Sequence, residues 1–246
     1  MGRCFQETFT IPYDMADVTG KAKLPDLLAH CLYVAGRQSV SLGMSDDIVF
    51  EQYGLVWIVT EHDVTIEGLP QLNETVIIET EALSYNKFFC YRRFSVYDQD
   101  EQLLMTAMTN FSLLDWKTRK VSRVVPEIVA VYQAPFDKAL RRGPRYQAID
   151  DPEVSRDYWV RFFDIDMNGH VNNSKYLEWM IDSMGYDFLC QHRPCTLNLK
   201  YTKEVSPKGT ITSRMTYDND NGISHHEIIS DGHINAQARV HWQKEE

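Results

Sequence analysis

The order of the predicted elements is the feature that most constrains what this chain can fold into. Apolar residues at helical spacing predict one helix over 24–43 and another over 173–189. Each helix is followed by four runs rich in β-branched and aromatic residues, separated by turn signals. The predicted strands cover residues 56–66, 75–83, 87–98 and 101–115, then 196–205, 210–218, 223–231 and 233–243. The chain therefore carries one helix and four strands twice.

Local sequence supports an internal repeat. The segments "TIEGLP" (65–70) and "TKEVSP" (202–207) each place a glutamate three residues before a proline, at the same point of the two successions. This alignment puts Glu67 in the place that matches Glu204. A long helix followed by antiparallel strands is typical of the hot-dog fold, in which a sheet wraps around a central helix. We expect an α+β chain of two tandem hot-dog domains that pack as a fused pair.

The domain boundaries are predicted from composition. Residues 125–149 carry three prolines and a cluster of basic side chains, which is typical of a linker. We therefore expect an N-terminal hot-dog domain over 1–124, a linker over 125–150 and a C-terminal hot-dog domain over 151–246.

Charge and composition exclude several classes of function. A hydrophobic content of 43% with 24% charged residues is typical of a soluble globular protein. The formal net charge of −10 argues against broad binding to nucleic acid or anionic membranes, since both need a positive field. Residues 1–15 lack the apolar core of a signal peptide and no apolar run could span a membrane, so we expect a cytoplasmic protein without membrane insertion. The five cysteines have no regular spacing and are expected to be reduced thiols.

The segment "DIDMNGHVNN" (164–173) holds more small polar groups than the start of a helix requires. Free backbone N–H groups and the helix dipole favour a developing negative charge at this point. Asp166, Asn168 and His170 alternate along the segment and, in an extended chain, would point to one side. His170 is then a candidate proton acceptor, oriented by Asp166, with Asn168 holding water or a carbonyl. Loops and caps use the same residue types, so an elaborate cap is the alternative.

The run "DIDMNGHVNNSKYLEW" (164–179) and the later "LNLKYTKEV" (197–205) resemble the signature region of the acyl-acyl carrier protein (acyl-ACP) thioesterases. These enzymes end fatty-acid synthesis by hydrolysing the acyl thioester. The missing organelle-targeting extension favours the bacterial type of this family. The resemblance implies a thioester hydrolase that releases free fatty acid from acyl-ACP, without metal or organic cofactor, with the carrier protein and the fatty acyl chain as its partners.

The resemblance also implies the catalytic residues. Asp166, Asn168 and His170 match the family's Asp-x-Asn-x-His pattern, and Glu204 matches a catalytic glutamate. In plant members a cysteine once taken for the nucleophile follows that glutamate, whereas this chain has Val205, so a Cys–His mechanism cannot operate there. Water activated by Glu204, His170 or both is the expected nucleophile. Judged from the residues alone, Glu204 is a carboxylate at the edge of a turn. The first half has no histidine before its helix, so one active site is expected.

Two further sets of residues are candidates for binding. Trp179, Met180 and Met184 lie on the apolar stripe of the second helix and are expected to line the acyl pocket, with plain core packing as the alternative. Carrier proteins of fatty-acid synthesis are acidic, so a basic cluster could steer one to the site. The candidates are Lys138, Arg141, Arg142 and Arg145 in the linker, or Lys117, Arg119, Lys120 and Arg123 before it, against the alternative of ordinary solvated charges.

Other functions stay open at this stage. The run "CQHRPC" (190–195) lacks the second ligand pair that a zinc site needs. An acyl-CoA thioesterase on the same fold is one alternative, and a non-catalytic module that binds the acyl chain or the carrier protein is another. The sequence does not decide the acyl chain length, the identity of the base or the oligomeric state, for which a homodimer is one arrangement.

Overall fold

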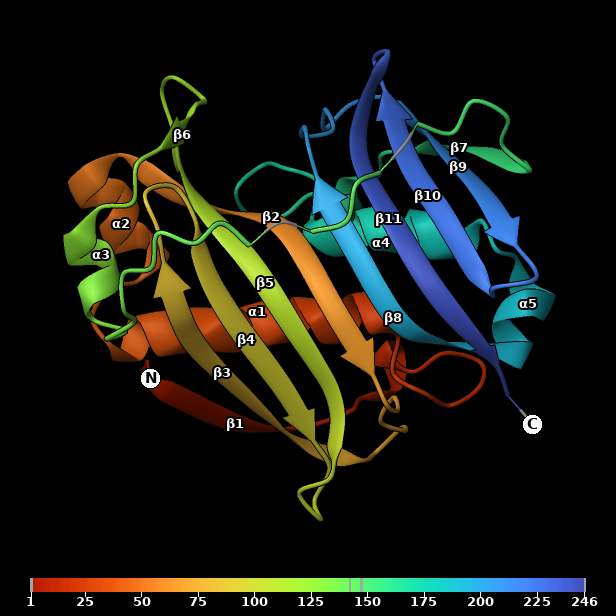
Figure 1. The fold of residues 1–246 in the computed structure, drawn as a ribbon, viewed down its shortest axis with the longest axis horizontal. Helices are drawn as coiled ribbons and strands as arrows, with labels where there is room; N and C mark the ends of the chain where they lie inside the picture. Colours follow the sequence, from red (N-terminus) through yellow and green to blue (C-terminus); the bar gives the residue numbers. More distant parts are fainter. Residues whose placement is uncertain (1, 142, 147, 246) are drawn as a thin grey trace. The chain divides into compact units, whose positions relative to one another are not determined.

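The computed structural model describes residues 2–141, 143–146 and 148–245. The chain divides into two compact units, Met1–His62 with Glu67–Arg142 and Asp63–Ile66 with Gly143–Glu246. Within the described ranges, none of the helices has the length and apolar character needed to cross a membrane. Each unit is built from antiparallel strands and one main helix (Figure 1).

In the first unit, the strands follow the spatial order β1-β3-β4-β5-β2, and β6 pairs with β5. The strands are β1 (Cys4–Thr10), β2 (Leu55–Ile66), β3 (Thr75–Tyr85), β4 (Cys90–Tyr97), β5 (Leu103–Asp115) and β6 (Val121–Ser122). The helices are α1 (Leu24–Ser41), α2 (Asp46–Tyr53) and α3 (Pro126–Ala130), with a short 3₁₀ turn η1 at Tyr13–Met15. Neighbouring strands joined by short turns are antiparallel, as in β3 against β4.

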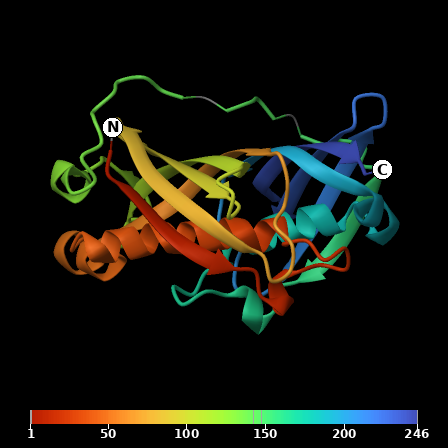
Figure 2. The same ribbon diagram turned by 90° about the horizontal axis from the view of Figure 1, so that it is seen from below.

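Helix α1 lies along one face of this sheet (Figure 2). Its buried side chains include Leu27 and Val34, both fully shielded from solvent, and the sheet contributes buried residues such as Ile78 on β3 and Phe94 on β4. Pro25 falls in the first turn of the helix, where a missing N–H costs no hydrogen bond. The predicted first helix is therefore present, wrapped by an antiparallel sheet.

Five elements of the first unit were not predicted: β1, α2, α3, the two-residue strand β6 and the 3₁₀ turn η1. Strand β1 pairs with β3 over its whole length, although its sequence shows little apolar alternation. Helix α2 begins at a Ser45 cap whose side chain accepts from the backbone N–H of Ile48. Helix α3 falls inside the predicted linker, and its Ile128 is fully buried in a core cluster with Val49 and Leu113.

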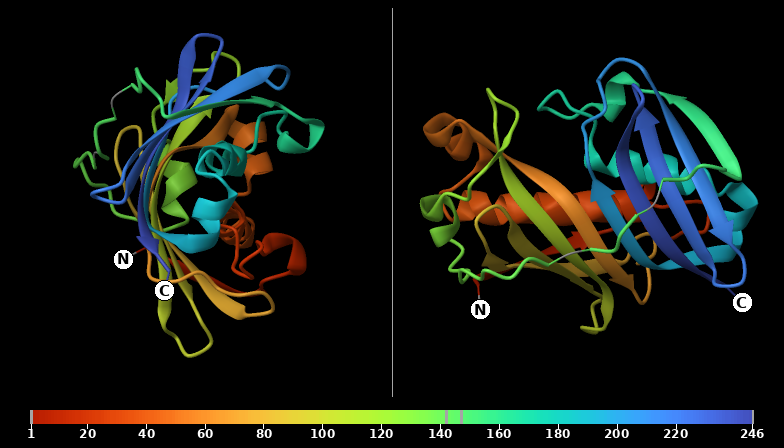
Figure 3. Two further views of the ribbon diagram at one scale, coloured as in Figure 1. Left: turned by 90° about the vertical axis from the view of Figure 1, so that its right-hand side faces the viewer. Right: turned by 45° about the horizontal axis from the view of Figure 1, so that its top comes forward.

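In the second unit, the strands follow the order β8-β11-β10-β9-β7. They are β7 (Val154–Trp159), β8 (His192–Tyr201), β9 (Thr210–Asp218), β10 (Ile223–Ser230) and β11 (His233–Lys244). The helices are α4 (Asn173–Asp182) and α5 (Tyr186–Gln191), and a 3₁₀ turn η2 covers Phe162–Asp164. Helix α4 covers one face of the strands, which it contacts chiefly at β9 and β10 (Figure 3).

The second half corrects two predictions. The helix predicted over 173–189 is two helices, because Gly185 between them has a left-handed φ of +87°, which ends α4 and starts α5 in a new direction. The strand predicted over 196–205 instead ends at Tyr201, so Glu204 lies beyond the strand and not within it.

Each unit also buries one histidine among neutral partners. Burial lowers the pKa of His62 to about 4 and that of His226 to about 3. The Nδ1 atom of His62 lies 2.9 Å from the Thr109 hydroxyl. The Nε2 atom of His226 lies 2.7 Å from the hydroxyl of Ser224, which itself accepts from the indole N–H of Trp242. Both histidines are therefore neutral in the folded protein near pH 7.

Because these two histidines are neutral in the folded protein, we expect the unfolding free energy to fall on mild acidification. As the pH falls from 6.5 to 5 the unfolded chain binds protons at both positions while the folded chain does not, so the unfolding free energy falls by up to about 1.4 kcal/mol per pH unit for each histidine. We expect His226→Gln to make this slope shallower by about half of the histidine contribution. Urea unfolding at several pH values measures it, and an unchanged slope would contradict the assignment.

Candidate active site

The segment between β7 and α4 forms a tight turn and not the extended chain predicted for it. The backbone N–H of Asp166 donates to the carbonyl of His170 at 2.8 Å, and that of Gly169 donates to the carbonyl of Asp166 at 3.0 Å. Ile165 and Val171 pair as an isolated antiparallel bridge on either side. The turn is possible because Gly169 adopts a φ of +81°, which an L side chain rarely adopts. The expected alternation of side chains is therefore wrong.

The side chain of Asp166 holds the backbone of this turn. Its Oδ1 atom accepts from the backbone N–H of Asn168 at 2.9 Å and from that of His170 at 3.2 Å. Asn168 itself is exposed. Asp166 thus fixes the main chain that carries the imidazole.

Asp164, immediately before the turn, is the anchor that sequence reasoning missed. Its side chain is fully buried and accepts from the backbone N–H of Arg161 at 2.7 Å and from the Arg161 guanidinium at 2.8 Å. Burial alone would raise the pKa of the Asp164 carboxyl, but the bonds from Arg161 outweigh it and the pKa is lowered. The Asp164 carbonyl accepts from the N–H of Asn172, whose side chain in turn caps α4 at Ser174. Both ends of the loop are therefore fixed.

The structure brings His170 and Glu204 together. The Nε2 atom of His170 lies 3.8 Å from Oε2 of Glu204, and the two side chains are 30% and 49% exposed. The pair is thus in contact with solvent while its backbone is held by buried groups. A water molecule or a small reacting group can reach both side chains from solvent.

The first unit contains the same loop without the histidine. The N–H of Asp17 donates to the carbonyl of Lys21 at 2.8 Å, and that of Gly20 donates to the carbonyl of Asp17 at 3.0 Å. Gly20 has a φ of +80°, and the Asp17 side chain accepts from the backbone N–H of Thr19 at 2.8 Å. Lys21 therefore occupies the place that His170 has in the second unit.

The match predicted between Glu67 and Glu204 is offset by two residues. The N–H groups of Glu67 and Gly68 both donate to the carbonyl of Leu104. In the second unit, the two N–H groups that share one carbonyl in this way are those of Thr202 and Lys203, which donate to Asn235. Glu67 thus corresponds to Thr202 in its backbone role, and the shared spacing to proline does not mark equivalent positions.

The predicted acyl-pocket residues lie on or next to α4. Trp179 is 3% exposed and Met180 is fully buried, whereas Met184 is half-buried in the turn after the helix. The Trp179 ring stacks on that of Tyr158, with centroids 6.3 Å apart, and the Trp179 carbonyl accepts from the Ser213 hydroxyl. These contacts place Trp179 and Met180 in the core of the unit, and their role in binding stays a prediction.

Of the predicted docking cluster, Lys138, Arg141 and Arg145 are exposed, and Arg142 lies outside the described residues. Arg141 also has a structural role, because its guanidinium lies over the Tyr91 ring and its backbone N–H donates to the Tyr91 hydroxyl. Among the residues that the structure describes, no group of three or more His, Cys, Asp or Glu side chains could hold a metal ion.

Comparison with known proteins identifies relatives over the whole chain. Family models of the N-terminal and C-terminal domains of acyl-ACP thioesterases match residues 2–132 and 146–244. A chloroplastic acyl-[acyl-carrier-protein] hydrolase of Cuphea viscosissima is 24% identical over 260 residues, which cover 98% of this chain and 63% of that protein. This chain therefore spans less than two thirds of the length of that curated relative.

Solved structures also match over nearly the whole of this chain. A Lactobacillus plantarum protein that carries the name oleoyl thioesterase is 30% identical, with a TM-score of 0.93 over 99% of this chain and 97% of that one. The 12:0-ACP thioesterase of Umbellularia californica is 20% identical, with a TM-score of 0.87 over 98% of each chain. The predicted fold class, α+β with two hot-dog folds in tandem, is confirmed.

The two loops predict matched effects on stability. Asp17→Ala and Asp166→Ala each remove an acceptor of hydrogen bonds inside a turn, so we expect each to lower the unfolding free energy by about 1 kcal/mol. Asp17→Asn and Asp166→Asn keep an acceptor oxygen and should cost less. Urea unfolding of the four variants measures this, and a loss confined to one of the two loops would refute their equivalence.

Proposed function

The chain belongs to the acyl-ACP thioesterase family, and from this premise we propose that it hydrolyses acyl-ACP to free fatty acid and carrier protein. The observation that carries the proposal is the contact between His170 and Glu204 at the end of a loop fixed by the buried Asp164 and by Asp166. The proposed catalytic residues are Asp166, Asn168, His170 and Glu204.

In the proposed reaction, Glu204 or His170 takes a proton from water as the water oxygen attacks the thioester carbonyl carbon. The tetrahedral intermediate then collapses, the C–S bond breaks, and the proton passes to the departing sulfur. A thiol has a pKa of roughly 8.5, so the sulfur leaves without a strong general acid. The positive end of the α4 dipole stabilises the oxyanion, and the exposed Asn168 amide holds the water or the thioester.

A covalent route through residue 205 is not available. Val205 has no nucleophilic atom, and its side chain is 3% exposed, packed against the interior of the unit. The absence of a thiol at this position supports direct attack by water. No acyl-enzyme intermediate on residue 205 takes part in the proposed reaction.

The proposal extends to the surroundings of the site. Trp179, Met180 and Met184 form the wall of the acyl pocket on the α4 side. The two domains cover residues 1–124 and 151–246, and of the segment 125–150 between them, α3 packs into the core of the first unit. The five free cysteines support a reducing compartment, and we keep the cytoplasm as the predicted location, although the curated plant relatives are chloroplastic. The proposal does not require a second copy of the chain.

Removing either member of the pair should abolish most of the activity. We expect His170→Ala and Glu204→Gln to lower kcat at least about 100-fold with acyl-ACP, because each removes a group that handles the proton in the transition state. The control is Glu67→Gln, the same chemical change at a glutamate of the first unit that the proposed site does not use, and it should keep the wild-type rate. Thiol release from acyl-ACP and acyl-CoA of several chain lengths measures it.

Each outcome decides between functions. Preference for carrier-protein thioesters supports the proposal, and preference for CoA thioesters replaces it with an acyl-CoA thioesterase. Binding of acyl-ACP without any turnover would make the protein a binding module.

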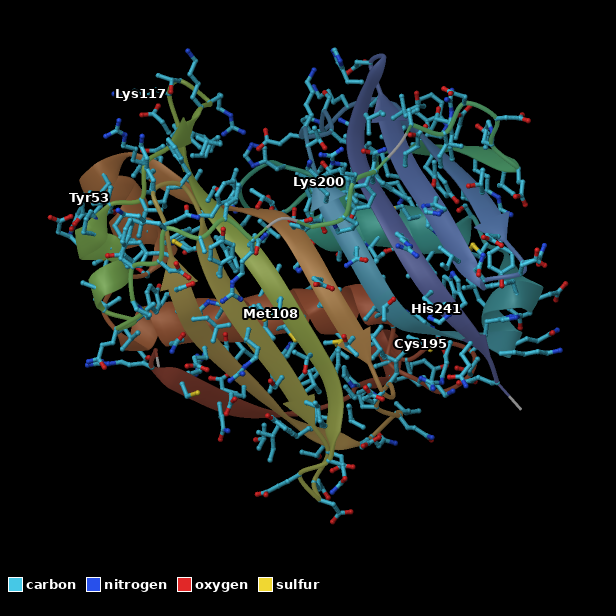
Figure 4. All side chains as sticks on the ribbon, viewed as in Figure 1. Tyr53, Met108, Lys117, Cys195, Lys200 and His241 are labelled. Carbon is cyan, nitrogen blue, oxygen red and sulfur yellow. The ribbon has the colours of Figure 1, made fainter. Side chains whose placement is uncertain are left out.

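We propose that the basic cluster of the linker docks the acidic carrier protein, and charge reversal tests this. Lys138→Glu with Arg145→Glu should raise KM for acyl-ACP about tenfold at low salt without changing kcat, and the difference should shrink as salt screens the charges. The comparison pair is Lys117→Glu with Lys120→Glu, at the exposed turn between β5 and β6. Figure 4 labels Lys117 in this turn. If only this second pair raises KM, the carrier protein docks at the turn.

A further inference from the structure

The peptide group that joins Glu204 to Val205 is held at both of its polar ends. Its carbonyl oxygen, that of Glu204, accepts from the Nδ2 atom of Asn235 at 3.1 Å. Its N–H, that of Val205, donates to the hydroxyl oxygen of Tyr176 at 2.8 Å. Because both bonds act on one rigid plane, they fix the direction in which the Glu204 side chain leaves the backbone.

Both partners of this peptide group are buried and are themselves held in place. Asn235, on β11, is 1% exposed, and its Oδ1 atom accepts from the Ser230 hydroxyl at 2.9 Å. Tyr176, on α4, is 4% exposed, and its ring packs edge-on against Tyr201. The Tyr201 hydroxyl donates to the carbonyl of Asn173 at the start of α4. The two contacts are therefore rigid.

We propose that Tyr176 and Asn235 are positioning residues that hold Glu204 against His170. This inference rests on the proposed thioester hydrolysis. Glu204 lies three residues beyond the end of β8, where the ladder no longer fixes the chain, so its placement needs other bonds. Tyr176 supplies one of them from the first turn of α4, the helix that directly follows the His170 loop, and so couples the two sides of the pair.

The chemistry of Tyr176 suits this role. Burial raises the pKa of its hydroxyl to about 12, so the group keeps its proton and accepts the Val205 N–H as a neutral oxygen. The nearby carboxylates of Glu204 and Asp166 act in the same direction. A phenylalanine at this position would keep the ring packing and lose only the acceptor.

The first test is Tyr176→Phe. We expect kcat with acyl-ACP to fall about 10- to 100-fold, because a small displacement of a catalytic group has effects of this size, while KM stays within about twofold. The matched control is Tyr158→Phe, which removes the hydroxyl bonded to Asp182 in the same unit and should keep the wild-type kcat. Asn235→Ser, which shortens the donor, should repeat the loss of kcat if Tyr176→Phe proves unstable.

A double-mutant cycle separates positioning from general damage. In a Glu204→Gln background there is no carboxylate to position, so adding Tyr176→Phe should lower the residual rate by less than twofold. An equal loss in both backgrounds, or a Tyr176→Phe enzyme as fast as Tyr158→Phe, would overturn the inference and leave the hydrolase assignment standing. A wild-type protein that releases no thiol from any acyl-ACP would instead overturn the proposed function, and this inference with it.

Discussion

The burial of one apolar face of α4 is the constraint on which the rest of the site depends. Leu177 and Met180 are almost completely shielded, so the helix has a fixed rotation and a fixed position against the strands of its unit. That rotation decides where the first turn of the helix lies, and with it the loop before it. The chemistry at His170 is therefore positioned by hydrophobic packing of residues that take no part in it.

The polar groups around the site divide into two kinds. Asp164, Asp166 and Asn235 each make hydrogen bonds to the backbone, and these bonds keep the loops in one conformation. His170 and Glu204 keep part of their surface in solvent. Buried polar groups without partners would be costly, whereas Asp164 and Asn235 bond to main-chain atoms and to the side chains of Arg161 and Ser230, so a polar site is compatible with a stable fold. Rigidity and chemical reactivity thus belong to different side chains.

Much of the architecture could be predicted, because the spacing of apolar residues shows which side of a helix or strand is buried. Turn residues show where the strands end. The strands at 210–218 and 223–231 and the helix over 24–43 agree with the structure to within two residues at each end. The predictions from sequence were wrong where one residue or one tertiary contact determined the local backbone conformation. Gly185 breaks an apolar stripe that continues past it, and Gly169 turns a segment that would otherwise read as extended.

The candidate site shows the same limit. The sequence showed that the loop holds more polar residues than a helix cap needs. It did not show that Asp164 is a buried anchor, because this depends on the Arg161 side chain folding back over it. The bonds to the peptide between Glu204 and Val205 come from Tyr176 and Asn235, each 29 or 31 residues from the residue it binds, so no local sequence pattern could have predicted them. Hydrogen bonds between side chains and distant backbone groups follow no periodic pattern in the sequence, so the sequence alone does not reveal them.

The loop that recurs in both units has a consequence for how such a chain can change over generations. In each copy the turn is closed by backbone bonds and by an aspartate, so the residue at position 21 or 170 is not what closes it. A substitution at either position therefore alters the chemistry of one copy with little penalty to folding. A duplicated fold of this kind can therefore lose or exchange reactivity in one half while both halves keep their fold.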